Sequence, residues 1–245
     1  MAPPVLLDVN GPVATITLNR PERRNAINQQ MLVDLYGMLE TVAAAEAIRV
    51  IIVTGNGPSF CAGLDLDAVG RENLFDPRGD GRDLPELMRA CKKPVIAAVS
   101  GHAVNRGFEL ALNCDFIIAA ENAQFSDNYV RVGIHPGWGI TQLLQQTVGQ
   151  RRAKQISFSC QPVFAHTALA WGLVNEVLPR ELLLDRAKAI AAQIVQADPE
   201  LLVTIKTLIE NCNRDPLEKA LDTERRGFKQ FLKEQIDRFT LTRKE

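Results

Sequence analysis

Three short apolar runs constrain the fold of this chain most strongly. They occupy residues 50–54, 95–99 and 116–120, and each is far shorter than the ~20 residues that a membrane-spanning helix needs. Such runs are typical of buried strands. A helical pattern begins near Asn28, because apolar side chains recur there at the 3.6-residue period (Met31, Leu32, Leu35, Met38, Leu39 and Val42). Strands that alternate with helices and short turns predict an α/β fold.

The two ends of the chain carry different patterns. Residues 5–9 and 13–18 flank Asn10-Gly11, a pair typical of a hairpin turn. From about Gln150 onward helical patterns dominate, over residues 187–195, 201–209 and 217–232, with stops at Pro199 and Pro216. Residues 70–83 are rich in Gly, Asp and Arg, which predicts a mobile surface loop.

Composition excludes several classes of protein. The 245 residues carry 28 Lys and Arg against 29 Asp and Glu, so bulk charge does not predict binding to nucleic acid or to a membrane surface. No secretion signal is visible at the N-terminus. The five cysteines are odd in number and scattered, which favours a reducing compartment. We therefore expect a soluble cytoplasmic protein.

Three segments combine glycines and polar side chains with predicted strand ends: residues 54–66, 100–111 and 123–139. Ligands of open α/β sheets gather at the carboxyl ends of strands. Each segment also has a simpler explanation, since glycine turns are common and Glu109 can merely favour the positive end of a helix. No P-loop or G-x-G-x-x-G motif is present, and the three histidines lack metal-ligand spacing, so we predict no metal site.

Taken together, the motifs resemble the crotonase, or enoyl-CoA hydratase/isomerase, superfamily over nearly the whole chain. Single pieces are weak signals, but their order is specific. They are Ile16-Thr17-Leu18-Asn19-Arg20-Pro21 with Asn25-Ala26, Phe60-Cys61-Ala62-Gly63-Leu64-Asp65-Leu66, Lys93-Pro94-Val95-Ile96-Ala97-Ala98-Val99, Gly107-Phe108-Glu109-Leu110-Ala111, Cys114-Asp115, Ala123-Gln124-Phe125, Pro136-Gly137-Trp138-Gly139 and Ala170-Trp171-Gly172-Leu173-Val174-Asn175.

The resemblance implies a spiral of ββα units, with a helical C-terminal region that packs into homotrimers, often paired as hexamers. Residues 1–190 would form the core with the acyl-CoA site, and residues 191–245 the region for trimerisation and for closing that site. The ligand would be an acyl-CoA thioester. Coenzyme A would enter as part of the substrate, and no separate cofactor is expected.

The resemblance also implies a reacting centre. The backbone N–H groups of Leu64 and Arg106 would form an oxyanion hole for the thioester oxygen. Arg106 departs from the family, since relatives usually carry a glycine run there. Glu109 matches one of the two glutamates of a hydratase, whereas Tyr129 occupies the place of the second. Asp127, two residues earlier, is the only nearby carboxylate that could substitute.

Contacts to the CoA moiety follow from the same resemblance. They would involve Arg24 and Ala26, the loop residues Ala62, Asp65, Leu66 and Asp67, and Phe231 and Lys233 from a neighbouring subunit. An exposed arginine or a helical phenylalanine has a structural explanation as well.

The leading prediction is an enoyl-CoA hydratase, a lyase of fatty acid metabolism, with a reduced acid/base set. An isomerase is an alternative, and so is a decarboxylase in which Arg106 pairs with a substrate carboxylate. A non-catalytic acyl-CoA binding protein is the alternative from another class, which the loss of the glycine run and of the second glutamate favours and the presence of Glu109 opposes.

Overall fold

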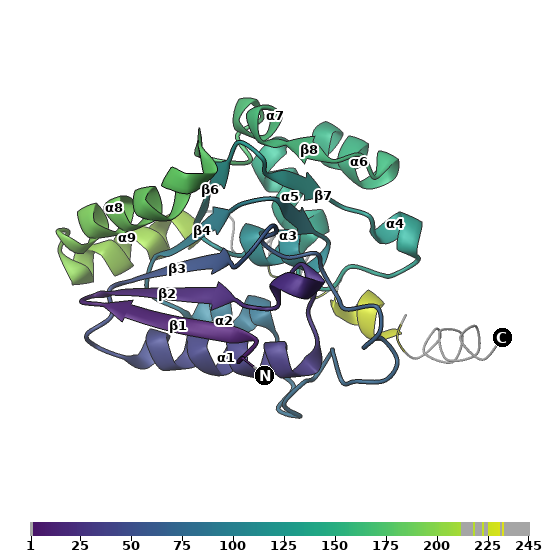
Figure 1. The fold of residues 1–245 in the computed structure, drawn as a ribbon, viewed down its shortest axis with the longest axis horizontal. Helices are drawn as coiled ribbons and strands as arrows, with labels where there is room; N and C mark the ends of the chain where they lie inside the picture. Colours follow the sequence, from purple (N-terminus) through teal and green to yellow (C-terminus); the bar gives the residue numbers. More distant parts are fainter. Residues whose placement is uncertain (1, 212–217, 219–221, 223–224, 231, 233–245) are drawn as a thin grey trace.

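A computed structural model describes residues 2–211, 218, 222, 225–230 and 232, and Figure 1 shows their arrangement. A six-stranded sheet runs through the middle of the fold in the order β1-β2-β3-β4-β6-β9. Its strands are β1 (Val5–Asn10), β2 (Val13–Leu18), β3 (Val50–Gly55), β4 (Val95–Val99), β6 (Phe116–Ala120) and β9 (Glu176–Leu178). All neighbouring strands are parallel except β1 and β2, which form the predicted hairpin.

Alternate residues of the central strands pack into two separate apolar layers. Val50 and Ile52 of β3 contribute to a cluster with Ala187 and Ala191 of α8 (Leu183–Val195). Ile51 and Val53, which alternate with them along β3, contribute to the larger cluster. That cluster includes the buried side chains of α1 (Gln29–Ala44) and α2 (Leu84–Ala90). Both faces of the sheet are thus covered, which is why these strands read as continuous apolar runs.

The predicted start of the first helix is confirmed by its cap. The Asn28 side chain accepts a hydrogen bond from the backbone N–H of Met31 at 3.0 Å, and α1 begins at the next residue. Such a cap satisfies one of the N–H groups that the first turn of a helix leaves without a partner.

A second, three-stranded sheet consists of β5 (His102–Val104), β7 (Gln124–Ser126) and β8 (Val163–Phe164). Near it, Figure 1 shows the helices of the middle of the chain. These are α3 (Arg106–Leu112), α4 (Tyr129–Val132), α5 (Ile140–Val148), α6 (Gln150–Ser159) and α7 (Ala165–Ala170). Two short 3-10 helices lie elsewhere: η1 (Pro21–Arg23) follows β2, and η2 (Arg180–Leu182) follows β9.

The C-terminal region begins with helices, as predicted. Pro199 separates α8 from α9 (Pro199–Asn211) and is the first residue of the latter, where a proline is tolerated. The division expected after residue 190 falls within α8 and stays a prediction. Residues 218, 222, 225–230 and 232 are helical, in agreement with the last predicted helix.

Residues 70–83 contain no helix or strand, as expected for a loop. Side chains nevertheless hold the loop against α1: the Glu72 carboxylate accepts from the backbone of Gln29 at 2.8 Å, and Arg78 pairs with Glu40 at 2.5 Å. In the described part of the chain, no helix has the length and apolar character to cross a membrane. The four cysteines described there are buried free thiols: Cys61, Cys91, Cys114 and Cys160.

Candidate active site

The segments that follow β3 and β4 meet at the carboxyl end of the main sheet. Cys61 forms an isolated parallel β-bridge with β5. Its N–H donates to the carbonyl of His102 at 2.9 Å, and its carbonyl accepts from the N–H of Val104 at 3.0 Å. Gly107 makes this approach possible, because a Cβ atom there would lie 2.2 Å from the carbonyl oxygen of Cys61. Two of the three predicted site segments are therefore held together by backbone contacts.

Leu64 and Arg106, the two predicted backbone donors, lie at this junction. A Cβ atom on Gly63, the neighbour of Leu64, would lie 3.7 Å from the backbone nitrogen of Arg106. Arg106 is the first residue of α3, so its N–H has no acceptor within the helix. Asp65, not Leu64, donates to the carbonyl of Ile27. Among the described residues, no acceptor takes up the backbone N–H of Leu64 or of Arg106, so both are available to a ligand.

Asn105 bridges this junction to the third segment, a role that the sequence did not reveal. Its backbone has φ 49° and ψ −113°, a conformation that favours glycine. Its side-chain oxygen accepts from the backbone of Asn128 at 2.7 Å, and its own N–H donates to Ser126 at 3.0 Å. These contacts fix the turn into α3, where Asn105 and Arg106 stand at positions expected to carry glycine.

Glu109 is fully buried and its carboxylate is held by donors from two other elements. Oε1 accepts from the backbone N–H of Trp138 at 2.9 Å, just before α5, and from that of Ile140 at 3.3 Å, the first residue of α5. Oε2 accepts from the hydroxyl of Tyr129 at 2.6 Å. Donors of this kind stabilise the ionised form of a carboxylate and fix its orientation.

Tyr129 lies beside Glu109, at the first position of α4. Burial, followed by the charge of Glu109, raises the pKa of the Tyr129 phenol well above its usual value of 10.0. The phenol is therefore protonated at neutral pH and acts as a donor. Asp127 is buried next to it, and its Oδ1 accepts from the backbone N–H of Tyr129 at 3.2 Å.

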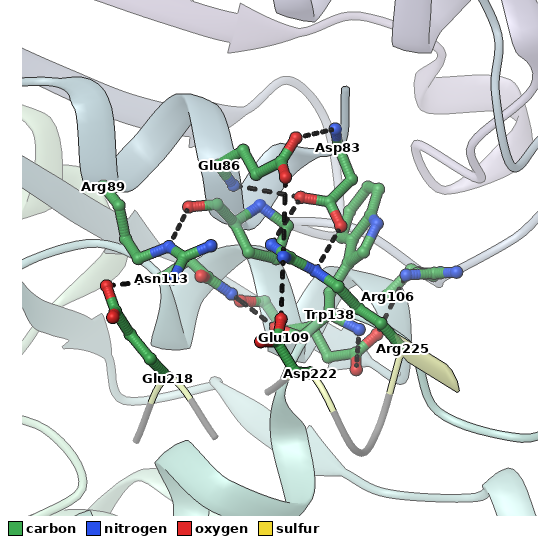
Figure 2. A network of polar contacts seen from close by, with 11 residues as sticks. Asp83, Glu86, Arg89, Arg106, Glu109, Asn113, Trp138, Glu218, Asp222 and Arg225 are labelled. Atoms are coloured by element: carbon green, nitrogen blue, oxygen red, sulfur yellow. Dashed lines mark hydrogen bonds and ion pairs between the residues drawn. The ribbon is translucent and has the colours of Figure 1, made fainter. Parts of the chain in front are cut away.

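The Arg106 side chain is buried beside Glu109, in the same helix, as its spacing of three residues predicts. Figure 2 shows its guanidinium next to Glu109 and Trp138. Nη1 lies 3.7 Å from Oε2 of Glu109, and Cζ lies 4.3 Å from the ring centre of Trp138 and 5.1 Å from that of Phe228. Neither aromatic contact was predicted from the sequence.

Arg106 also lines a cavity with a volume of about 540 Å³. Gly137 and Trp138 lie beside Arg106 in its wall, and the remaining lining comes from the loop before α2, from α2 itself and from the C-terminal residues. This volume is in the range that small-molecule sites occupy.

The predicted CoA contacts in the first half of the chain come from two adjacent segments. The backbone N–H of Ala62 donates to the carbonyl of Arg24 at 3.0 Å, and the carbonyl of Ala26 accepts from the Arg20 guanidinium. Arg24 is exposed, with φ 52°, at the end of η1. The segments that carry these residues therefore lie side by side.

The loop residues differ in how available they are. Leu66 is 56% exposed and Asp67 is exposed beside Arg23, whereas Asp65 is buried and pairs with Arg20 at 2.9 Å. Asp65 thus holds the loop in place. Phe231 and Lys233 lie outside the described residues. No group of three His, Cys, Asp or Glu side chains in the described part of the chain is arranged to hold a metal ion.

The fold and these residues define an α/β protein with an enzyme-like site, in which backbone donors and a buried, oriented carboxylate meet at the ends of parallel strands. The sequence model of the enoyl-CoA hydratase/isomerase family matches residues 8–244. The chain belongs to this family, and the resemblance to the crotonase superfamily is confirmed.

Individual relatives match this chain over most of its length. The chain is 37% identical to the probable enoyl-CoA hydratase 1, peroxisomal, of Arabidopsis thaliana, over 88% of this chain and 82% of the relative. It is also 37% identical to the 2,3-dehydroadipyl-CoA hydratase of Escherichia coli, over 88% of this chain and 85% of the relative. A crystal structure of an enoyl-CoA hydratase from Mycobacterium avium superposes with a TM-score of 0.84 at 35% identity, over 96% of this chain and 99% of that one.

Proposed function

We propose that this protein hydrates the double bond of 2-enoyl-CoA thioesters. The observation that carries the proposal is the buried carboxylate of Glu109, in the helix that starts at Arg106. This carboxylate accepts hydrogen bonds from Tyr129, Trp138 and Ile140. A carboxylate fixed in this way can take and return a proton next to a bound thioester. The names of the relatives support the same reaction.

In the proposed reaction the thioester oxygen accepts hydrogen bonds from the backbone N–H groups of Leu64 and Arg106. Negative charge collects on this oxygen as water adds to the double bond. Two donors already in place are worth about 3 kcal/mol each to such a step. Because they are backbone groups, the arginine side chain at position 106 does not remove them.

Glu109 serves as the acid and base in turn. It takes a proton from water while the water oxygen bonds to C3, and the electrons of the double bond pass to the thioester oxygen. The same proton then returns to C2, so that one molecule of water is added overall. Tyr129, as a neutral phenol, orients Glu109 and the water.

Isomerisation is the second candidate, and the protonated state of Tyr129 favours it. Moving a double bond requires only that one base removes a proton at one carbon and returns it at another. Glu109 alone is sufficient for this step, whereas hydratases of the expected type use two carboxylates. The same backbone donors would stabilise the intermediate.

The CoA moiety is proposed to lie along residues 62–67 and 24–26, where Leu66 offers an exposed apolar side chain. We further propose a homotrimer or a dimer of trimers. Leu201, Ile205 and Ile209 form an exposed apolar stripe with four-residue spacing on α9. Light scattering that gives only the mass of one chain would contradict this assembly. The buried free thiols support a cytoplasmic location.

The test of the proposed activity is incubation with crotonyl-CoA. We expect the ultraviolet absorbance of the conjugated thioester to fall, and mass spectrometry to find a product heavier by one water molecule. A 3-enoyl-CoA offered in parallel tests isomerisation, because its conversion raises the same absorbance. Binding of CoA thioesters without turnover of either substrate would contradict both activities.

A further inference from the structure

Arg106 carries a buried positive charge with an unmet hydrogen-bond donor. Its side chain is 2% exposed, and Nη1 makes no hydrogen bond within the described part of the chain. The carboxylate beside it does not supply the missing acceptor, because Oε2 of Glu109 lies 3.7 Å away and accepts from Tyr129 instead. A buried donor without an acceptor, above all a charged one, is costly in free energy.

Two aromatic rings hold the guanidinium of Arg106 in place but do not accept a hydrogen bond from Nη1. The rings of Trp138 and Phe228 stabilise its charge through their π faces, but they offer no acceptor in the plane of the guanidinium. Gly137 leaves the space, since a Cβ atom there would lie 3.1 Å from Nη2 of Arg106. The result is a cation fixed in position whose donors are suited to a ligand.

The cavity of about 540 Å³ offers a ligand access to this cation. Two acidic side chains of its lining, Asp83 and Glu86, already pair with Arg225, at 3.0 and 3.5 Å. Figure 2 shows Arg225 between them. Arg225 also pairs with Asp222 at 3.6 Å, so it cannot offset these carboxylates alone. The described residues of the lining carry four acidic side chains (Asp76, Asp83, Glu86 and Asp222) and four basic ones (Arg106, Arg225, Arg226 and Lys229), so an anionic group can approach Arg106 without entering a lining of net negative charge.

We propose that Arg106 binds a carboxylate at the far end of the acyl chain, so that the preferred ligands are CoA monothioesters of dicarboxylic acids. A carboxylate matches the fork of a guanidinium and supplies the acceptor that Nη1 lacks. The inference rests on the proposed function for the thioester. In that function the backbone N–H of Arg106 holds the thioester oxygen, and its side chain leads into the cavity, which separates the two ends of the ligand.

Binding tests the inference without requiring turnover. Calorimetry compares hexanoyl-CoA with the six-carbon thioester that carries a carboxylate at C6. We expect the carboxylated ligand to bind at least about tenfold more tightly to the wild-type protein. Arg106→Met should abolish the preference, and Arg106→Lys should retain part of it. Lys229→Met, which removes another cation of the cavity lining, should leave most of it.

Kinetics separates this inference from the proposed function. The kcat/KM for trans-2-hexenoyl-CoA is compared with that for its counterpart carboxylated at C6. If hydration occurs but both affinity and kcat/KM are equal for the two thioesters, the inference is wrong and the proposed function stands. If neither is hydrated but the carboxylated ligand binds preferentially, the inference stands and the proposed function is wrong. If neither ligand binds, the inference is wrong. The comparison of the two ligands on the wild-type protein gives this answer even if Arg106→Met fails to fold.

Discussion

The hydroxyl of Tyr129 donates a hydrogen bond of 2.6 Å to Oε2 of Glu109, from the first turn of α4 to the middle of α3. Both side chains are buried, and the pKa of Tyr129 is raised, so the contact joins a neutral phenol to a carboxylate. Tyr129, which is expected at the place of the family's second glutamate, therefore donates to Glu109 and does not compete with it for a proton.

Tyr129→Phe removes this donor and leaves the ring in place. We expect kcat for enoyl-CoA hydration to fall by about tenfold or more, because the carboxylate loses the hydrogen bond from the Tyr129 hydroxyl. Tyr36→Phe is the matched control: Tyr36 is also buried, packed beside Arg78, and we expect its loss to change kcat little. Equal losses of kcat in the two variants would show that the Tyr129 hydroxyl has no specific role.

Gly107→Ala tests the close approach of the two site segments. A methyl group would overlap the carbonyl of Cys61, so we expect a loss of about 1–3 kcal/mol in the free energy of unfolding, together with weaker acyl-CoA binding. Gly37→Ala in α1 is the control, since nothing lies within 4 Å of its Cβ position. This variant should be stabilised by about 0.5–1 kcal/mol. Urea unfolding measures both, and similar values for the two variants would contradict the overlap.

Alkaline pH should destabilise the fold. Burial raises the pKa of Cys61 from 9.0 to about 12, and it also raises the pKa of Cys91, Cys114, Tyr36 and Tyr129. Since the folded pKa exceeds the unfolded one, the stabilisation is complete below about pH 9 and is lost as the pH rises toward 12. Each group then lowers the free energy of unfolding by about 1.4 kcal/mol per pH unit.

Urea unfolding at a series of pH values between about 8 and 11 measures this slope. Cys61→Ala should reduce the slope, because it removes one thiol that ionises in the unfolded chain. A free energy of unfolding that does not fall over this range would show that these groups ionise as readily in the folded protein as in the unfolded one.

Local signals made much of the fold predictable. The hairpin and the three buried strands were predicted to within one residue of their observed bounds, and the first helix to within one residue of its start. A turn pair, an apolar run or a helical period marks each of them. The second sheet was not predicted. β5 and β7 have three residues each, too few to show a periodicity, and they pair across about twenty residues of intervening chain.

The site was predictable only in part. Glu109, Tyr129 and the pairing of Arg106 with Glu109 followed from motifs and helical spacing, and the structure brings these three side chains together. The aromatic contacts of Arg106 could not be predicted, because Trp138 and Phe228 approach it only through the tertiary fold. No local pattern marks residues that meet in this way.

The role of Glu109 is tested most directly by the rate of crotonyl-CoA hydration by Glu109→Gln beside the wild-type protein. The variant preserves the size of the side chain but cannot take a proton from water, so we expect kcat to fall by roughly 10²–10⁴. Calorimetry should find acyl-CoA binding within a few-fold of wild type, and circular dichroism should find the fold intact. An unchanged hydration rate in a folded variant that binds the thioester would show that Glu109 is not the acid and base of the reaction.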